Sequence, residues 1–181
     1  MKFIKQKIKG VILIKPKIFK DDRGRFNRSY CLEEYRKNGI IDNFKQTNLS
    51  FNIKKNTIRG FHYQLPPNEE NKTISCLSGS IYDIVVDLRF NSSTFLKWQH
   101  FLLNEENAQT LYIPAGCANA FQTQKNNTLI SYYHSGLYKP QSEARLGYDD
   151  PYFNFIWPSK PSVISKKDLI VDNFRLINIK K

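Results

Sequence analysis

One histidine of the chain, His62, stands in the segment "IRGFHYQLPPNEENKTI", with Arg59 before it and Lys72 after it. An imidazole can bind a metal, transfer a proton or simply pack in a core. A metal site on a β-sheet usually takes two or three imidazoles and a carboxylate from neighbouring strands. The other two histidines, His100 and His134, form no H-x-H pair with it. The sequence therefore predicts no metal site.

The same residue types suit proton transfer next to a carbonyl group. A histidine base takes the carbon-bound proton, a lysine cation holds the enolate oxygen, and a tyrosine returns a proton. The chain has all three residue types, and it shows no serine or cysteine nucleophile motif. Spacing alone, however, favours a packed core histidine at position 62. The residues by themselves therefore leave both roles of His62 open.

Two arginines beside glycines are candidates for binding phosphate. Arg23 lies in "DDRGRF" and Arg59 precedes Gly60, and a guanidinium group matches phosphate oxygens in a bidentate way. Aromatic residues such as Phe26 and Tyr138 could stack on a base or a sugar. Each of these side chains is equally ordinary as a surface ion-pair partner or as packing. The pattern alone identifies no ligand.

Composition indicates one folded domain over residues 1–181. Hydrophobic residues make up 40% and aromatic residues 14%, which is typical of a globular chain long enough to bury a core. The net charge of +12 is spread along the chain rather than gathered in a stripe, so no nucleic-acid partner is expected. No apolar run approaches the roughly 20 residues that cross a bilayer, and lysines interrupt the first residues too often for a signal peptide. We therefore expect a cytoplasmic protein without a membrane partner.

Short strands and turns dominate the pattern of apolar residues. The segment "SIYDIVVDLR" alternates between two faces, and Gly79 precedes it, so residues 73–89 are predicted to form a hairpin. Helices are expected only over residues 32–40, ended by Gly39, and after Ser165 as N-cap. The aromatic and proline-rich segment 149–169 is expected to wrap over the strands. Short strands at even spacing with little helix predict an all-β barrel or sandwich.

These segments, in this order, resemble the nucleotide-sugar 3,5-epimerases that act on dTDP-4-keto-6-deoxyglucose on the way to dTDP-rhamnose. The resemblance rests on "DDRGRF", "KQTNLS", "IRGFHYQLPP", "NKTISCLSGSIYDIVVDLR", "STFLKW", "LYIPAG", "YKPQSE", "DDPYFNFIWP" and "ISKKDL". It implies a cupin-like jelly-roll β-barrel with a few short helices, which works without a metal or other cofactor. It also implies a nucleotide-diphosphate sugar as substrate and, usually, a homodimer. The N-terminal segment "VILIKPKIF" is a candidate for strand pairing across such a dimer.

The resemblance assigns four catalytic roles. His62 matches the base that takes the C3 and C5 protons, and Asp168 matches the carboxylate that orients this histidine. Lys72 matches the residue that stabilises the enolate at O4, and Tyr132 matches the acid on the opposite face of the sugar. Six further positions match residues around the diphosphate, the nucleotide and the sugar: Arg23, Phe26, Gln46, Asn48, Arg59 and Tyr138.

Two departures from the family pattern bear on the substrate. Where the family usually reads P-x-G-x-A-H-G-F, this chain has "PAGCANAF", so Asn119 replaces a histidine near the sugar. An amide can form hydrogen bonds but cannot titrate, which opens the alternative of inversion at one centre only, C5 or C3. Arg28 stands where the family commonly has a glutamate near the thymine. Arginine only donates hydrogen bonds, which would suit a CDP-linked sugar, unless Arg28 simply points to solvent.

Two less favoured alternatives complete the predictions. A 3,4-ketoisomerase of the same superfamily leans on a pair of histidines, and Asn119 stands where the second would be. A non-catalytic cupin that only binds a sugar nucleotide would not need a base and an acid on opposite faces. The joint presence of His62, Lys72, Tyr132 and Asp168 therefore favours the epimerase.

Overall fold

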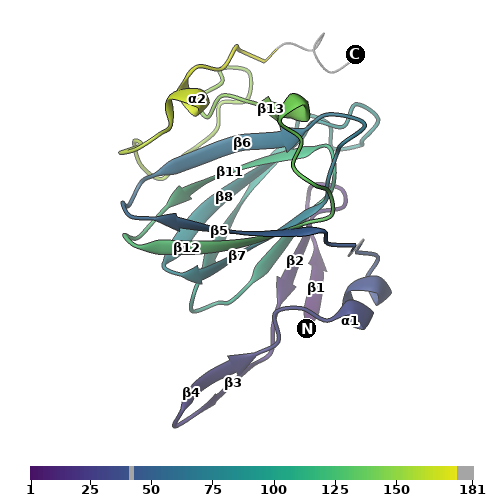
Figure 1. Cartoon of the computed structure of the whole chain (residues 1–181), viewed down its shortest axis with the longest axis vertical. Coiled ribbons are helices and arrows are strands. Elements are labelled where there is room, and N and C mark those ends of the chain that lie inside the picture. Colours follow the sequence, from purple (N-terminus) through teal and green to yellow (C-terminus); the bar gives the residue numbers. More distant parts are fainter. Residues whose placement is uncertain (41–42, 175–181) are drawn as a thin grey trace.

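The computed structural model describes residues 1–40 and 43–174, which form two antiparallel sheets that face each other (Figure 1). The six-stranded sheet has the order β1 (Lys2–Lys5), β2 (Ile12–Lys15), β10 (Thr110–Ile113), β7 (Lys72–Ser78), β12 (Thr128–His134) and β5 (Gln46–Asn52). The five-stranded sheet has the order β13 (Glu143–Arg145), β6 (Ile58–Gln64), β11 (Cys117–Thr123), β8 (Ser80–Asp87) and β9 (Trp98–Asn104). This cupin-like architecture confirms the all-β prediction. Over the described residues the two sheets stay separate and do not close into a continuous barrel.

The main core lies between the two sheets. Ile74 of β7 and Ile130 of β12 pack in one buried cluster with Val85 of β8 and Phe121 of β11, and each of the four is at most 2% exposed. Burial of one such side chain contributes roughly 1.5–3 kcal/mol. The core therefore fixes the distance between the two sheets, and with it the width of any cavity at the end of this layer.

The outer face of the five-stranded sheet is covered by the C-terminal segment. Ile84 and Val86 of β8 point away from the main core and pack in a second cluster with Phe153 and Leu146. Both faces of β8 are buried, although its sequence alternates, because this wrap covers the side that would otherwise face water. The predicted alternation and the predicted wrap are both confirmed.

The predicted hairpin over residues 73–89 is wrong. β7 pairs with β10 and β12, whereas β8 pairs with β9 and β11, so these consecutive strands belong to opposite sheets. Gly79 connects them with a φ of +84°, and a Cβ atom there would collide with Thr128. Gly79 therefore connects a strand of one sheet to a strand of the other. Alternating side chains on both sides of a glycine fit this connection as well as they fit a hairpin.

The two α-helices agree with their sequence signals. α1 (Leu32–Lys37) ends two residues before Gly39, which has a φ of +73° and donates its backbone N–H to the carbonyl of Arg36 at 3.0 Å. In α2 (Lys166–Leu169) the hydroxyl of Ser165 accepts from the backbone N–H of Asp168 at 3.2 Å. This cap fixes the backbone that carries Asp168. A short 3-10 turn, η1 (Pro140–Ser142), precedes β13.

The N-terminal region supplies both an inner strand and a projecting hairpin. β2 pairs with β1 on one side and with β10 on the other, so the part Ile12–Lys15 of the candidate dimer segment "VILIKPKIF" has no free edge for a partner strand, whereas Ile18 and Phe19 of that segment lie on β3. β3 (Ile18–Asp21) and β4 (Gly24–Asn27) pair with each other and project from the body of the molecule (Figure 1). None of the helices in residues 1–40 and 43–174 is long and apolar enough to span a membrane.

Candidate active site

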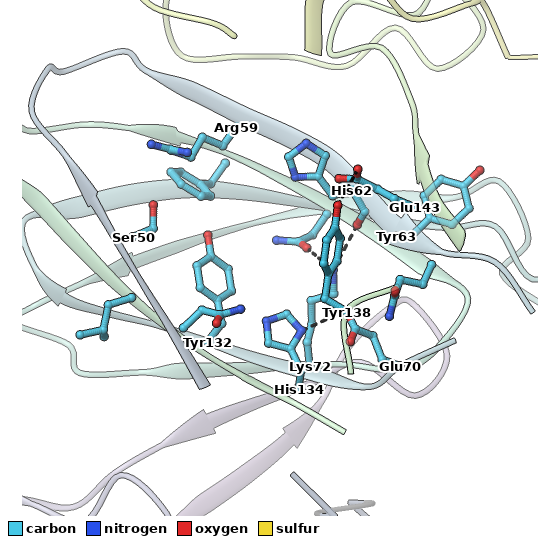
Figure 2. A pocket seen from close by; sticks show the side chains of 15 residues that line it. Ser50, Arg59, His62, Tyr63, Glu70, Lys72, Tyr132, His134, Tyr138 and Glu143 are labelled. Carbon is cyan, nitrogen blue, oxygen red and sulfur yellow. Dashed lines mark hydrogen bonds and ion pairs between the residues drawn. The ribbon is translucent and has the colours of Figure 1, made fainter. Parts of the chain in front are cut away.

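A cavity of about 250 Å³ opens between the two sheets and is lined by side chains of β5, β6, β7, β11 and β12 (Figure 2). His62 projects into it from β6 in the five-stranded sheet. Tyr132 projects into it from β12 in the six-stranded sheet, so the two side chains come from opposite walls. Lys72, at the start of β7, also lines this cavity.

Close contact between β6 and β11 sets the position of His62. Gly60 has a φ of +111°, and a Cβ atom there would lie 2.6 Å from the backbone carbonyl of Asn119. Only glycine avoids both the strain and the collision. Two residues further on, His62 is the partner of Asn119 in the β6–β11 register, so both side chains reach the same cavity.

His62 and Asp168 form a histidine–carboxylate dyad. His62 Nε2 lies 2.7 Å from Asp168 Oδ1, and the side chain of Asp168 is 6% exposed, whereas that of His62 is 40% exposed. A carboxylate that accepts from Nε2–H fixes the tautomer of the ring and leaves Nδ1 with its lone pair. The dyad therefore provides a proton acceptor with a defined orientation.

The surroundings of Asp168 keep this carboxylate ionised. Burial alone would raise the pKa of the Asp168 carboxyl, but the hydrogen bond and charge of His62, the hydrogen bond of Ser165 and the charge of Arg145 lower it below its ordinary value. Arg145 Nε lies 3.5 Å from Asp168 Oδ1. An ionised partner is what an imidazole base needs when it becomes an imidazolium.

Lys72, Asn119 and Asp83 form a buried chain below the cavity. Lys72 Nζ donates to the backbone carbonyl of His62 and to Asn119 Oδ1, both at 3.1 Å, and Asn119 Nδ2 donates to Asp83 Oδ2 at 3.1 Å. Burial lowers the pKa of the Lys72 ammonium, which the charges of Glu70 and Asp83 partly offset. Burial raises the pKa of Asp83 to about 8, against the opposing effects of Asn119 and Lys72. The site thus holds a buried lysine beside a carboxyl whose pKa is raised toward the neutral range.

Tyr132 is held in its protonated form. Burial raises the pKa of its phenol, the charge of Asp83 raises it further, and the charge of Arg59 opposes both. Arg59 is fixed at the cavity by a hydrogen bond of 2.8 Å from its Nε to Asn52 Oδ1. A phenol on one wall and an imidazole on the other have the chemistry to serve as the acid and the base of a proton transfer across a bound ligand.

Several of the predicted binding residues lie at the mouth of this cavity. Asn48 lines it from β5, and Tyr138 lines it from the segment after β12. The hydroxyl of Tyr138 donates to Glu143 at 3.1 Å, and its backbone N–H donates to Gln46 Oε1 at 3.2 Å. Gln46 therefore supports Tyr138 from behind, while Asn48 and Tyr138 themselves border the space.

The structure does not bring Arg23, Phe26 and Arg28 to the cavity of the same chain. Arg23 and Phe26 lie on the projecting β3–β4 hairpin, where the side chain of Arg23 is 90% exposed and Phe26 is 72% exposed. Arg23 pairs with Asp21 at 2.6 Å. Arg28 follows the hairpin, and its Nη1 lies 3.0 Å from Glu34 Oε1.

Sequence reasoning missed a histidine and a carboxylate of the cavity that pair with each other. His134 and Glu70 both line it, and His134 Nδ1 lies 3.0 Å from Glu70 Oε1. The alternation along β12 carried the necessary signal for His134, because Tyr132 and a residue two positions later share one face of a strand. Glu70 precedes β7 in a segment without periodicity, so no sequence signal pointed to it.

The fold and the site together define a class of protein: a cupin-like enzyme scaffold with a histidine–carboxylate dyad facing a partly buried phenol across a ligand-sized cavity. Among residues 1–40 and 43–174, no three His, Cys, Asp or Glu side chains come together as a set for a metal ion.

Comparison with known proteins identifies the family. The family model for dTDP-4-dehydrorhamnose 3,5-epimerase matches residues 5–175. The chain is 37% identical over 169 residues to the dTDP-4-dehydrorhamnose 3,5-epimerase of Sinorhizobium fredii, covering 93% of this chain and 87% of that one. The protein belongs to this family of isomerases.

Solved structures of relatives share the fold. The dTDP-4-dehydrorhamnose 3,5-epimerase of Bacillus anthracis, with TDP and pyrophosphate bound, superposes with a TM-score of 0.93 at 32% identity, covering 96% of this chain and 99% of that chain. A 3'-monoepimerase from Streptomyces bikiniensis, in complex with dTDP-quinovose, superposes with a TM-score of 0.84 at 28% identity, covering 90% and 83%. The same architecture therefore occurs in a 3,5-epimerase and in an enzyme described as acting at one centre.

Proposed function

We propose that this protein epimerises a dTDP-linked 4-keto-6-deoxy sugar by taking a proton from the sugar with one side chain and returning a proton to it from another. The observation that carries the proposal is the His62–Asp168 dyad, 2.7 Å between Nε2 and Oδ1, facing Tyr132 across the cavity. Family membership supports the substrate class, since the structure from Bacillus anthracis holds TDP and a relative from Legionella pneumophila holds dTDP-4-keto-L-rhamnose.

In the first step His62 removes a proton from a carbon next to the 4-keto group. The hydrogen bond from Nε2 to Asp168 leaves Nδ1 to take the proton, and the ionised carboxylate stabilises the imidazolium that forms. The electron pair moves to O4 and gives an enolate. Lys72 is the cation assigned to that oxygen, and its hydrogen bonds to Asn119 and to the carbonyl of His62 hold it beside the base.

In the second step Tyr132 returns a proton from the other face. The phenol O–H bond breaks, a new C–H bond forms on the side opposite His62, and the 4-keto group is restored. Because burial raises the pKa of Tyr132, the phenol keeps its proton until the enolate is formed. Removal from one face and return to the other inverts the carbon.

The test is proton exchange in deuterated water. The protein is incubated with dTDP-4-keto-6-deoxyglucose, and C3 and C5 are followed by NMR. Deuterium with inversion at both carbons supports the 3,5-epimerase, and His62→Asn should abolish it. Migration of the carbonyl to C3 would instead identify a ketoisomerase. Binding without any exchange would leave only a sugar-nucleotide-binding cupin.

Inversion of a single carbon is the second candidate. Asn119 favours it, because the amide between Lys72 and Asp83 cannot carry a proton where a titratable residue could. The 3'-monoepimerase relative supports it at the level of fold. The same NMR experiment separates the two candidates, since a single-centre enzyme incorporates deuterium at one carbon only.

We also propose that the active form is a homodimer in which the β3–β4 hairpin completes the site of the partner copy. A two-stranded hairpin alone is marginally stable in water, and this one carries Phe19 and Phe26, 51% and 72% exposed. It projects from the body of the molecule (Figure 1), and none of its residues lines the cavity of its own chain. Seating on a second copy would bury these rings and bring Arg23 and Phe26 to a substrate.

Subunit mixing tests this arrangement. His62→Asn and the double variant Arg23→Ala, Phe26→Ala should each be inactive alone. Mixed and re-equilibrated, they should recover about a quarter of the wild-type activity, because one site of each mixed dimer has both an intact base and an intact hairpin. No recovery from mixed dimers verified by mass would contradict a shared site and leave the epimerase proposal standing.

A further inference from the structure

Glu70 and His134 form a second histidine–carboxylate pair in the cavity that contains the first. Their side chains are only 10% and 13% exposed, and His134 Nδ1 lies 3.0 Å from Glu70 Oε1. Both residues line the cavity with His62 and Tyr132. None of the catalytic steps above uses this pair.

The pair lies on the wall that carries the acid. Tyr132 and His134 are two positions apart on β12, so their side chains share the face toward the cavity. Their rings stack with centroids 5.9 Å apart and an interplanar angle of 28°. Figure 2 shows His134 between Tyr132 and Glu70. Because Nδ1 is bonded to Glu70, Nε2 remains for another partner, and no other described residue forms a hydrogen bond with it.

Inversion of two carbons makes a demand that inversion of one does not. Each inversion consumes the proton of the Tyr132 phenol and leaves a phenolate. A second inversion during the same binding event requires that this phenolate is protonated again while the sugar covers it. Asn119 cannot supply the proton, because its amide nitrogen does not titrate. Lys72 has one donor left beside its bonds to the carbonyl of His62 and to Asn119, and the proposed mechanism uses that donor for the enolate oxygen.

We propose that His134, held by Glu70, is the relay that returns a proton to Tyr132 between the two inversions. This inference rests on the proposed epimerase function. The Nε2–H bond of His134 breaks and the O–H bond of Tyr132 forms, directly or through one water molecule. The neutral imidazole then regains a proton from solvent, while the Glu70 carboxylate holds the ring and stabilises its charged form. His134 is therefore a positioning and relay residue that acts through Tyr132.

The test is His134→Gln with time-resolved NMR in deuterated water. Glutamine keeps a side chain that can bond to Glu70 but cannot relay a proton at neutral pH. We expect the first inversion to stay within about 3-fold of wild type and the second to slow at least about 10-fold, which is less than the roughly 10²- to 10⁴-fold of a direct acid or base because His134 acts through Tyr132. A singly inverted sugar should then accumulate. Glu70→Gln should shift the product ratio in the same direction by less, and melting temperatures of both variants check the fold.

His100→Gln is the matched control, because this histidine is exposed on β9 and stacks on Tyr82 outside the cavity. It should leave both inversions unchanged. Equal slowing of both inversions in His134→Gln would overturn the relay in favour of a structural role. Unchanged inversion of both carbons would overturn it as well, and so would a wild-type protein that inverts one carbon only. A wild-type protein without any exchange would instead refute the proposed function.

Discussion

Lys72 and Asn119 are joined by a hydrogen bond of 3.1 Å from Nζ to Oδ1, and this bond sets the orientation of the amide. An ammonium group has only donors, so the amide oxygen must face it and the amide nitrogen must face away. The nitrogen accordingly donates to Asp83 at 3.1 Å. Asn119 thus separates a buried cation from a buried carboxyl, where it can orient the cation without taking part in proton transfer.

Asn119→Ala should therefore impair the chemical step more than binding. Lys72 would lose one of its two hydrogen-bond acceptors, and its ammonium would no longer be fixed toward the enolate oxygen. We expect kcat to fall about 10- to 100-fold, below the loss typical of a complete oxyanion-hole donor, with KM within about 3-fold of wild type. Steady-state kinetics check this. A rise of KM at unchanged kcat would show that Asn119 binds substrate and does not orient Lys72.

Asp83 should make the stability of the protein depend on pH. Its folded-state pKa of about 8 lies above the ordinary value of 3.8. The folded state therefore binds more protons than the unfolded state between these values, and this carboxyl destabilises the fold increasingly as pH rises from about 4 to about 8. Asp83→Asn should remove this loss of folding stability at high pH.

The measurement compares melting temperatures at pH 5 and pH 9. Each kcal/mol shifts the Tm of a chain of this size by roughly 2–4 °C. The Tm difference between the variant and wild type should therefore be at least about 4 °C more in favour of the variant at pH 9 than at pH 5. Asp22→Asn, in the exposed turn of the hairpin, should give no such gain. A constant offset between the Asp83 variant and wild type at both pH values would contradict the raised pKa.

Asp168→Asn should disable the base while preserving the shape of the site. The amide can donate toward His62 Nε2, which favours the ring tautomer with its proton on Nδ1, the nitrogen that has to accept one. We expect kcat to fall about 10²- to 10⁴-fold with little change in KM. Asp172→Asn, on the exposed segment after α2, is the control and should behave as wild type. Deuterium exchange at wild-type rates in the Asp168 variant would exclude the His62–Asp168 dyad as the base.

The sequence predicted the class of fold because alternation and glycine turns are local signals. It could not predict which sheet each strand joins. Gly79 was assigned to a hairpin, since β7 and β8 alternate in the same way whether they pair with each other or cross between sheets. Apolar alternation encodes which side of a strand is buried, and the partner strand is decided only by packing over the whole chain.

The residues of the site also divide into those that sequence signals predict and those that only the fold brings together. His62 and Asp168 are 106 positions apart, and only the resemblance to a family linked them before the fold did. The His134–Glu70 pair, 64 positions apart, has no motif of its own. Arg23 and Phe26 are expected near a substrate, yet neither lines the cavity of its own chain. The sequence alone does not show whether a residue contributes to the site of its own chain or to the site of a partner copy.

The nucleotide preference can be tested through Arg28. Its Nη1 lies 3.0 Å from Glu34 Oε1, so part of its donor capacity is already used within the chain. We therefore expect dTDP to bind more tightly than CDP by at least about 10-fold, or 1.4 kcal/mol, measured by isothermal titration calorimetry. Arg28→Glu, which would supply an acceptor for the thymine N3–H, should widen the gap. Tighter binding of CDP by the wild-type protein would instead support a CDP-linked substrate.

The closest backbone approach in the site gives a prediction about both stability and activity. Gly60 has a φ of +111°, and an added Cβ atom would lie 2.6 Å from the carbonyl oxygen of Asn119. Gly60→Ala should therefore push β6 away from β11, with a loss of about 2–5 kcal/mol from backbone strain and overpacking together. His62 follows two residues later on β6, so the base should also move relative to Lys72. We therefore expect kcat to fall even at temperatures where the variant is still folded.

The variant Gly39→Ala separates the effect of backbone strain from the effect of overpacking. Gly39 also has a positive φ, +73°, but no described atom lies within 4 Å of an added Cβ atom. This control should lose about 1 kcal/mol from the left-handed backbone alone and keep full activity, because it ends α1 away from the cavity. Urea unfolding and initial rates measured on both variants decide the matter. Equal losses of stability with activity intact would mean that the contact between β6 and β11 does not position His62.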